Sequence, residues 1–99
     1  MKVYLAGRMK DMADLNRPAF AKAARRLRGD GHIVFNPAAA NLEGTALPKI
    51  MAYVLGQLCL CEAVAMLPGW WRSGGARIEW MLARYLGMKV IYLKQQGRT

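Results

Sequence analysis

Short apolar segments alternate along the chain with longer segments in which apolar residues recur every three or four positions. The short segments predict β-strands, and they are residues 2–7, 32–37, 63–68 and 89–93. The longer segments predict helices, and they are residues 17–31, 47–61 and 73–87. Strands that alternate with helices are typical of a parallel sheet with right-handed crossovers, so we expect an α/β fold.

The ends of the predicted helices carry capping and stop signals. Asn16 and Ser73 stand where an N-cap is expected, and Gly29, Gly31 and Gly87 stand where the helices should stop. The segment 63–68 is apolar throughout, which predicts a strand buried on both faces of the sheet.

The chain has 99 residues, enough for one domain with its own core. We place that domain at residues 1–94 and expect a polar tail at residues 95–99. No apolar run reaches the ~18–20 residues of a membrane span, and no signal-peptide pattern is present, so we expect a cytoplasmic protein with no membrane partner. Cys59 and Cys61 predict buried, reduced thiols, and we expect neither a metal nor a cofactor.

The chain is strongly basic. Its net charge is +9, from 15 Lys and Arg residues against six Asp and Glu residues. This excess predicts an anionic partner, which can be nucleic acid, a phosphorylated small molecule or an acidic protein surface, and the charge does not choose among them. The sequence has no helix-turn-helix, RNP or zinc-finger pattern, so we expect no specific nucleic-acid recognition and only electrostatic binding.

Three loops follow the predicted strands at one edge of the sheet. Their sequences are GRMKD (7–11), NPAAAN (36–41) and PGWWRSGG (68–75). In open parallel sheets, ligands bind outside the carboxyl ends of the strands. This edge is therefore the candidate site.

The third predicted helix starts at Ser-Gly-Gly, residues 73–75, and carries an acid close to its start. The free backbone N–H groups of such a start favour an anion, and glycines allow it a close approach. Glu79 lies four residues after Gly75 and shares its helix face, where its carboxylate could attack an anomeric carbon. The ordinary alternative is a surface carboxylate paired with Arg77 or Arg84.

Other side chains have both structural and functional interpretations. Tyr4, in the first strand, is by default a core aromatic. Trp70 and Trp71, in a loop, can stack on a base, pack internally or form an interface. His32 is expected at a strand edge, and the basic residues of the helix at 17–31 are expected on a solvated face.

Several short motifs, taken together, resemble a known family. In chain order they are VYLAG, NRPAF, ARRLRGDGH, VFNPA, AVAMLPGW and SGGARIE, and they span residues 2–93. They resemble a small uncharacterised family that is common in phage and prophage genomes and is affiliated with the nucleoside 2-deoxyribosyltransferase superfamily. The resemblance implies a flavodoxin-like fold: an open parallel sheet of about four strands with helices on both faces.

The resemblance also implies an activity and a set of site residues. The superfamily cleaves or exchanges the N-glycosidic bond of deoxynucleosides or their 5′-monophosphates. Glu79 matches the nucleophile that forms a covalent deoxyribosyl intermediate, and Tyr4 matches a tyrosine beside it. The implied ligand-binding residues are Gly7, Arg8, Met9, Lys10, Ser73, Gly74 and Gly75.

The chain departs from the superfamily pattern at the residue that assists the leaving base. The superfamily carries an aspartate there, and the matching position is Val54. A second family aspartate corresponds to Glu62. Valine cannot donate a proton, and general acid catalysis typically contributes ~10²–10⁴-fold in rate. The resemblance therefore supports the predicted fold more strongly than the predicted activity.

We therefore expect a protein that binds a deoxynucleoside or nucleotide, with or without weak N-glycosidase activity. The alternative is a catalytically inactive phage accessory protein that binds a host protein through its basic surface, which bears tryptophans. A non-specific nucleic-acid binder is a third interpretation, based on charge alone. The many apolar residues, with the two adjacent tryptophans and the apolar second helix, predict a homodimer.

Overall fold

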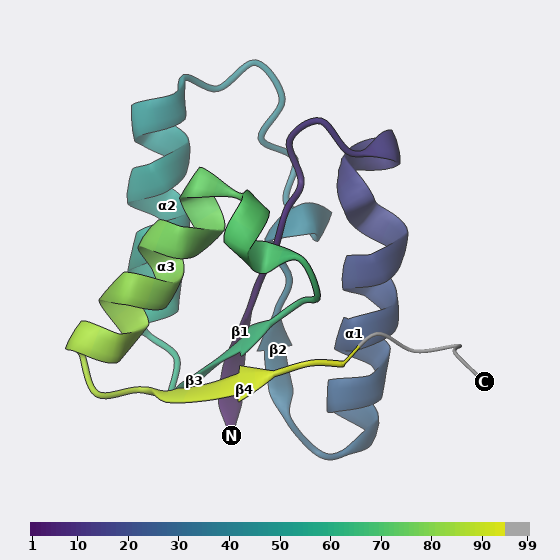
Figure 1. Cartoon of the computed structure of the whole chain (residues 1–99), viewed down its shortest axis with the longest axis vertical. Helices are drawn as coiled ribbons and strands as arrows, with labels where there is room; N and C mark the ends of the chain where they lie inside the picture. The colour runs from purple at the N-terminus through teal and green to yellow at the C-terminus, as the bar shows by residue number, and fades with distance from the viewer. Residues whose placement is uncertain (95–99) are drawn as a thin grey trace.

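The computed structural model describes residues 1–94, and the predicted tail at 95–99 lies outside them. Four strands and three helices alternate along the chain (Figure 1). They are β1 (Lys2–Ala6), α1 (Arg17–Gly29), β2 (Ile33–Phe35), α2 (Leu47–Cys59), β3 (Ala63–Met66), α3 (Gly74–Tyr85) and β4 (Lys89–Tyr92). Each lies within its predicted segment, and the strands are shorter than predicted because pairing stops where the loops of the sheet edge begin.

The strands form one parallel sheet in the order β2-β1-β3-β4. Helix α1 covers one face, and α2 and α3 cover the other (Figure 1). The predicted flavodoxin-like α/β architecture, with about four parallel strands between helices, is confirmed.

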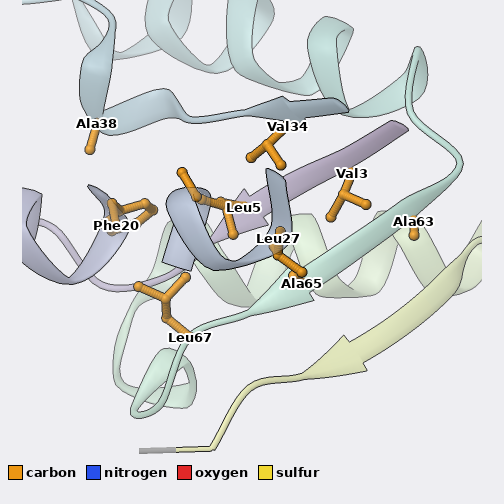
Figure 2. Close-up of a cluster of buried hydrophobic side chains, with 10 residues drawn as sticks. Val3, Leu5, Phe20, Leu27, Val34, Ala38, Ala63, Ala65 and Leu67 are labelled. Atoms are coloured by element: carbon orange, nitrogen blue, oxygen red, sulfur yellow. The ribbon is translucent and has the colours of Figure 1, made fainter. Parts of the chain in front are cut away.

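The two faces of the sheet belong to two hydrophobic clusters because side chains alternate along a strand. In β1, Val3 and Leu5 point toward α1 and pack with Phe20 and Leu27 (Figure 2). Tyr4, between them, faces α2 and α3. Every residue of β3 is buried, which confirms the strand predicted to be covered on both faces.

The strand order reverses between the two central strands. The chain leaves β1 for β2 on one side, and leaves β3 for β4 on the other. A crevice forms at such a switch point, outside the carboxyl ends of the strands. The loops after β1 and β3 therefore meet at the predicted site edge.

The turns at the ends of the strands hold features that the hydrophobic pattern did not predict. Three short 3-10 helices are present, at Ala13–Asn16, Pro37–Ala39 and Trp70–Arg72. Asp14, Leu15 and Asn16 adopt left-handed backbone conformations, with φ of 50°, 52° and 60°. Three consecutive non-glycine residues in this region are costly, so the loop before α1 is held in an unusual shape by its surroundings.

Asn16 is the N-cap of α1, as predicted, but its side chain makes no capping bond, because its backbone is left-handed; the side chain donates instead to the carbonyl of Arg8, at 2.9 Å. The prediction that both cysteines are buried was wrong. Cys59 is exposed, and only Cys61 is buried, because Leu58 takes the buried face of the last turn of α2 and Cys59 lies on another face. The predicted stops are correct at Gly31 and Gly87, whose φ values of 94° and 74° suit glycine.

None of the helices within residues 1–94 has the length and apolar character needed to cross a membrane.

Gly7 ends β1 where the backbone passes close to two side chains. A Cβ added there would lie 2.9 Å from Cβ of Leu67 and 3.2 Å from Cζ of Phe20. We expect Gly7→Ala to lower the free energy of unfolding by about 1–3 kcal/mol, because the core must shift to accept the methyl group. Chemical denaturation measures this loss.

Gly29 supplies the matched control. It is helical, and an added Cβ meets no atom within 4 Å. Gly29→Ala should leave stability unchanged or slightly higher, since alanine favours the helix. Equal losses in the two variants would contradict the packing role of Gly7.

Candidate functional site

A cavity of about 580 Å³ opens at the predicted edge of the sheet. Its walls come from the loops after β1 and β2, the start of α3 and one side of α2. It is lined by Glu79 and by all seven residues proposed for ligand binding: Gly7, Arg8, Met9, Lys10, Ser73, Gly74 and Gly75. The fold thus brings these separate segments to one place.

The start of α3 forms one wall of this cavity. Ser73 is the N-cap as predicted, and its Oγ accepts a hydrogen bond from the backbone N–H of Ala76 at 3.1 Å. The first N–H groups of a helix have no partner inside the helix. Those of Gly74 and Gly75 lie at the cavity wall without a Cβ above them, so an anion can approach closely.

Glu79 lies in the second turn of α3 and turns inward. Its side chain is 8% exposed, and it is the one buried charged residue among those the structure describes. The hydroxyl of Tyr4 donates to its Oε2 at 2.6 Å. A paired surface carboxylate is therefore the wrong interpretation: within residues 1–94 the single ion pair joins Arg17 to Asp14.

The two basic residues near Glu79 in sequence have other partners. Arg77 donates to the backbone carbonyl of Trp71 at 2.9 Å, and Arg84 lies over the ring of Trp80, 5.0 Å from its centroid. Both are exposed on the outer face of α3, while Glu79 faces the sheet. Helical periodicity separates them, because neighbours two and five positions away do not share a face.

Burial changes the pKa values of Glu79 and Tyr4. It raises the pKa of Glu79 from an ordinary 4.5 to about 7, while the hydrogen bond from Tyr4 opposes the rise. The pKa of the Tyr4 hydroxyl is raised well above its usual range by burial and by the neighbouring carboxylate. Tyr4 therefore stays a proton donor in a hydrogen bond, and Glu79 is the group that titrates near neutrality.

Tyr4 is held in place by packing on the face of the sheet that α2 and α3 cover. It is completely buried, and its ring stacks on Phe35 of β2 with centroids 5.4 Å apart. It does not line the cavity, so its contact with the site passes through Glu79. Tyr4 is therefore both a core aromatic and the neighbour of Glu79.

One oxygen of Glu79 remains open. Every buried side-chain oxygen and nitrogen within residues 1–94 has a hydrogen-bond partner. Oε2 has Tyr4, and Oε1 accepts no hydrogen bond from those residues, so Oε1 must reach the cavity that Glu79 lines. Such an oxygen is free to act as a base or as a nucleophile.

Val54, which stands where the resemblance implies an aspartate, is part of the same cavity. Val54 of α2 is 5% exposed and lines the wall. Glu62, matched to the second family aspartate, lies at the other end of the sheet, where it accepts a hydrogen bond from the backbone of Lys2 at 2.8 Å. Neither position places a second buried acid beside Glu79.

The rim of the cavity is basic. Arg8, Lys10, Arg17 and Arg72 line it, against the exposed acids Asp11 and Glu43. This charge and the start of α3 both favour an anionic group on the ligand.

Sequence reasoning missed the apolar wall that α2 contributes. Leu47, Ile50, Met51 and Val54 all line the cavity. Their spacing of three, four and seven residues is the signature of one helix face, and that signal was available in the sequence. What the spacing could not show was that this face turns partly toward a cavity instead of wholly toward the core.

The remaining candidates lie outside this cavity. Trp70 packs on Trp80 and Tyr92, with ring centroids 5.2 Å and 6.2 Å away, while Trp71 is exposed. His32 lies just before β2, where its Nδ1 is 3.2 Å from the amino terminus. No group of three or more potential metal ligands gathers in the described part of the chain.

Comparison with known proteins gives the family of the chain. The family model described as "Domain of unknown function (DUF4406)" matches residues 1–92. The chain belongs to this family. No curated protein sequence gives a significant match to this DUF4406 member.

The structure of this DUF4406 chain is similar to that of a 2-deoxyribosyltransferase from the psychrotolerant bacterium Bacillus psychrosaccharolyticus. The TM-score is 0.76 at 22% sequence identity, and the match covers 100% of this chain and 76% of that chain. At this identity the similarity establishes a shared fold. The fold that the resemblance implied is therefore confirmed.

The raised pKa of Glu79 predicts a pH-dependent stability. A carboxyl whose pKa is higher in the folded state stabilises the fold fully below its unfolded pKa of 4.5, and this contribution is lost as the pH rises toward about 7. The free energy of unfolding should fall by roughly 3 kcal/mol across this interval, and Glu79→Gln should remove most of the fall. Urea titrations from pH 4.5 to 8 measure both.

Glu62→Gln is the control, because Glu62 is exposed and its amide oxygen can still accept from Lys2. That variant should keep the wild-type pH profile. If Glu79→Gln also kept it, the carboxyl of Glu79 would not be the buried titrating group.

Proposed function

We propose that the protein binds a deoxynucleoside or its 5′-monophosphate in this cavity and uses Glu79 as a nucleophile in slow N-glycosidic cleavage. One observation carries the proposal: a buried carboxyl, hydrogen-bonded by Tyr4 at 2.6 Å, leaves one oxygen open to the cavity. The volume of about 580 Å³ is within the ~300–1,000 Å³ of typical small-molecule sites.

The walls of the cavity match the parts of such a ligand. The N–H groups at the start of α3 and the basic rim suit a phosphate. The apolar face of α2 suits a base or the carbon face of a sugar. The sugar then lies between them, near Glu79.

In the proposed reaction, Oε1 of Glu79 attacks C1′ of the deoxyribose. A bond forms between the carboxylate and C1′ as the bond to the base nitrogen breaks, and the electron pair of that bond leaves with the base. The base takes a proton from water, and a second water, or another base, then releases the sugar from Glu79. Tyr4 supports the step because its hydrogen bond favours the ionised carboxylate, which is the nucleophilic form.

Two features slow this reaction. Val54 cannot give a proton to the departing base from the position that matches the family aspartate, and general acid catalysis typically contributes ~10²–10⁴-fold. The pKa of about 7 leaves part of the Glu79 carboxyl protonated at neutral pH. The rate should therefore rise as the pH increases through about 7.

Release of free base from deoxynucleoside 5′-monophosphates, followed by chromatography, tests the proposal. We expect slow release from the wild type and none from Glu79→Ala, with a covalent sugar adduct on Glu79 detectable by mass spectrometry of the wild type. Val54→Asp should raise the rate by about 10-fold or more, because it supplies a proton donor.

Val54→Asn is the matched control, since it has the size and polarity of aspartate but cannot act as an acid. It should give no increase. Base release from Glu79→Ala at the wild-type rate would exclude Glu79 as the nucleophile and return the protein to a non-catalytic binding role.

The predicted homodimer has an observation of its own. The outer face of α3 exposes Ile78, Met81 and Tyr85, which are 49%, 61% and 87% exposed. Their spacing of three and four residues forms a continuous apolar stripe, and such stripes mark protein interfaces. We propose that a second copy of the chain covers this stripe, with a host protein as the competing partner.

Light scattering at micromolar concentration should give twice the 11.0 kDa chain mass. Met81→Lys should reduce this to one chain, because it buries a charge in the interface. Leu60→Lys adds the same charge at a residue of similar exposure, 62%, at the end of α2, and should stay dimeric. A wild-type mass of one chain would exclude self-association and leave the stripe to another protein.

A further inference from the structure

A second cavity, of about 510 Å³, lies on the other side of the loop that joins β3 to α3. Its walls come from α1, from this loop and from the end of β4. It shares one residue, Arg72, with the cavity that holds Glu79. The two cavities are therefore neighbours at the same edge of the molecule.

The charge of the second cavity has one sign. Lys22 and Arg26 of α1, Arg72 of the loop and Lys94 after β4 line it, and no acidic residue does. Lys22 and Arg26 are four residues apart and so share a helix face. Four cations from three parts of the fold thus surround one groove, in a chain whose net charge is +9.

An aromatic side chain stands among these cations. Trp71 lines the groove and is 55% exposed. Its ring meets Trp70 in an edge-to-face contact with centroids 6.2 Å apart, and its carbonyl accepts the bond from Arg77 at 2.9 Å. Trp70 is itself packed on Trp80. The indole of Trp71 is therefore anchored on one side and open on the other.

We propose that this groove binds single-stranded nucleic acid, with a base stacked on Trp71 and the backbone phosphates on Lys22, Arg26, Arg72 and Lys94. A positively charged groove that follows the backbone, combined with an exposed aromatic platform, is the usual arrangement in proteins that bind single strands without sequence preference. The proposal concerns a site separate from Glu79 and does not rest on the catalytic proposal.

The geometry favours a strand over other anions. A single phosphate needs one or two cations, whereas four cations from three parts of the chain line this groove. A duplex keeps its bases stacked and offers none to Trp71, and an acidic peptide would use the cations without requiring the aromatic platform. The shared Arg72 also lets a strand continue from this groove toward the other cavity.

Fluorescence anisotropy with a labelled oligothymidylate of about 12 nucleotides tests the proposal, since single-strand sites cover ~4–16 nucleotides. Trp71→Ala should weaken binding roughly 5- to 150-fold and leave the slope of log K against log salt unchanged, because stacking releases no counterions. Tyr53→Ala, which removes a 44% exposed aromatic outside the groove, should have no effect.

Two adjacent arginines of α1 give a matched charge test. Both are exposed, but Arg26 lines the groove and Arg25 does not. Arg26→Ala should lower the magnitude of the salt slope by about 0.7, the value for one phosphate contact on a single strand, and Arg25→Ala should leave it unchanged. Each variant removes one positive charge from the chain, so a difference between their salt slopes shows that the position of the charge in the groove matters.

Three results would overturn the proposal. Equal effects of Arg25→Ala and Arg26→Ala would reduce the binding to non-specific attraction by net charge. Retention of full affinity in Trp71→Ala, together with equally tight binding of polyglutamate, would indicate an acidic protein partner. Binding of thymidine monophosphate as tight as that of the oligothymidylate, and equally sensitive to Trp71→Ala, would assign the groove to a small molecule.

Discussion

The hydrogen bond between Tyr4 and Glu79 is the interaction around which the site is arranged. Tyr4 occupies the central strand with no exposed surface, and a buried hydroxyl without a partner would destabilise the fold. Glu79 supplies that partner at 2.6 Å and becomes buried itself. The same contact that satisfies the core holds a carboxyl with a pKa of about 7 at the wall of a cavity. The packing of the core and the protonation of Glu79 therefore depend on one pair of side chains.

Val54 gives the cavity an apolar wall at the position where the family resemblance implies an aspartate. The helix start, the basic rim and the buried carboxyl of Glu79 are all in place, and the wall beside them is apolar. A valine that is 5% exposed contributes to packing with Leu58 and its neighbours, which an aspartate there would disturb. This arrangement suits ligand retention better than fast turnover, as the proposed slow cleavage requires.

The loop between β3 and α3 connects the two cavities. Its 3-10 turn, Trp70–Arg72, directs Trp70 into an aromatic cluster and leaves Trp71 open to solvent. Arg72 then faces both cavities, and Ser73 starts α3. One short segment thus sets the position of the groove proposed for a strand and of the helix start proposed for a phosphate.

The sequence by itself determined the order of elements, the parallel sheet and the edge at which the loops meet, because hydrophobic periodicity and crossover handedness are local or general rules. It also placed the cap at Ser73 and the stop at Gly87. It could not decide between a surface and a buried Glu79, since both suit the helix pattern and only the packing of α3 on β1 brings Tyr4 within reach. The second cavity and the left-handed turn at Asn16 likewise depend on contacts between distant segments, which no local pattern encodes.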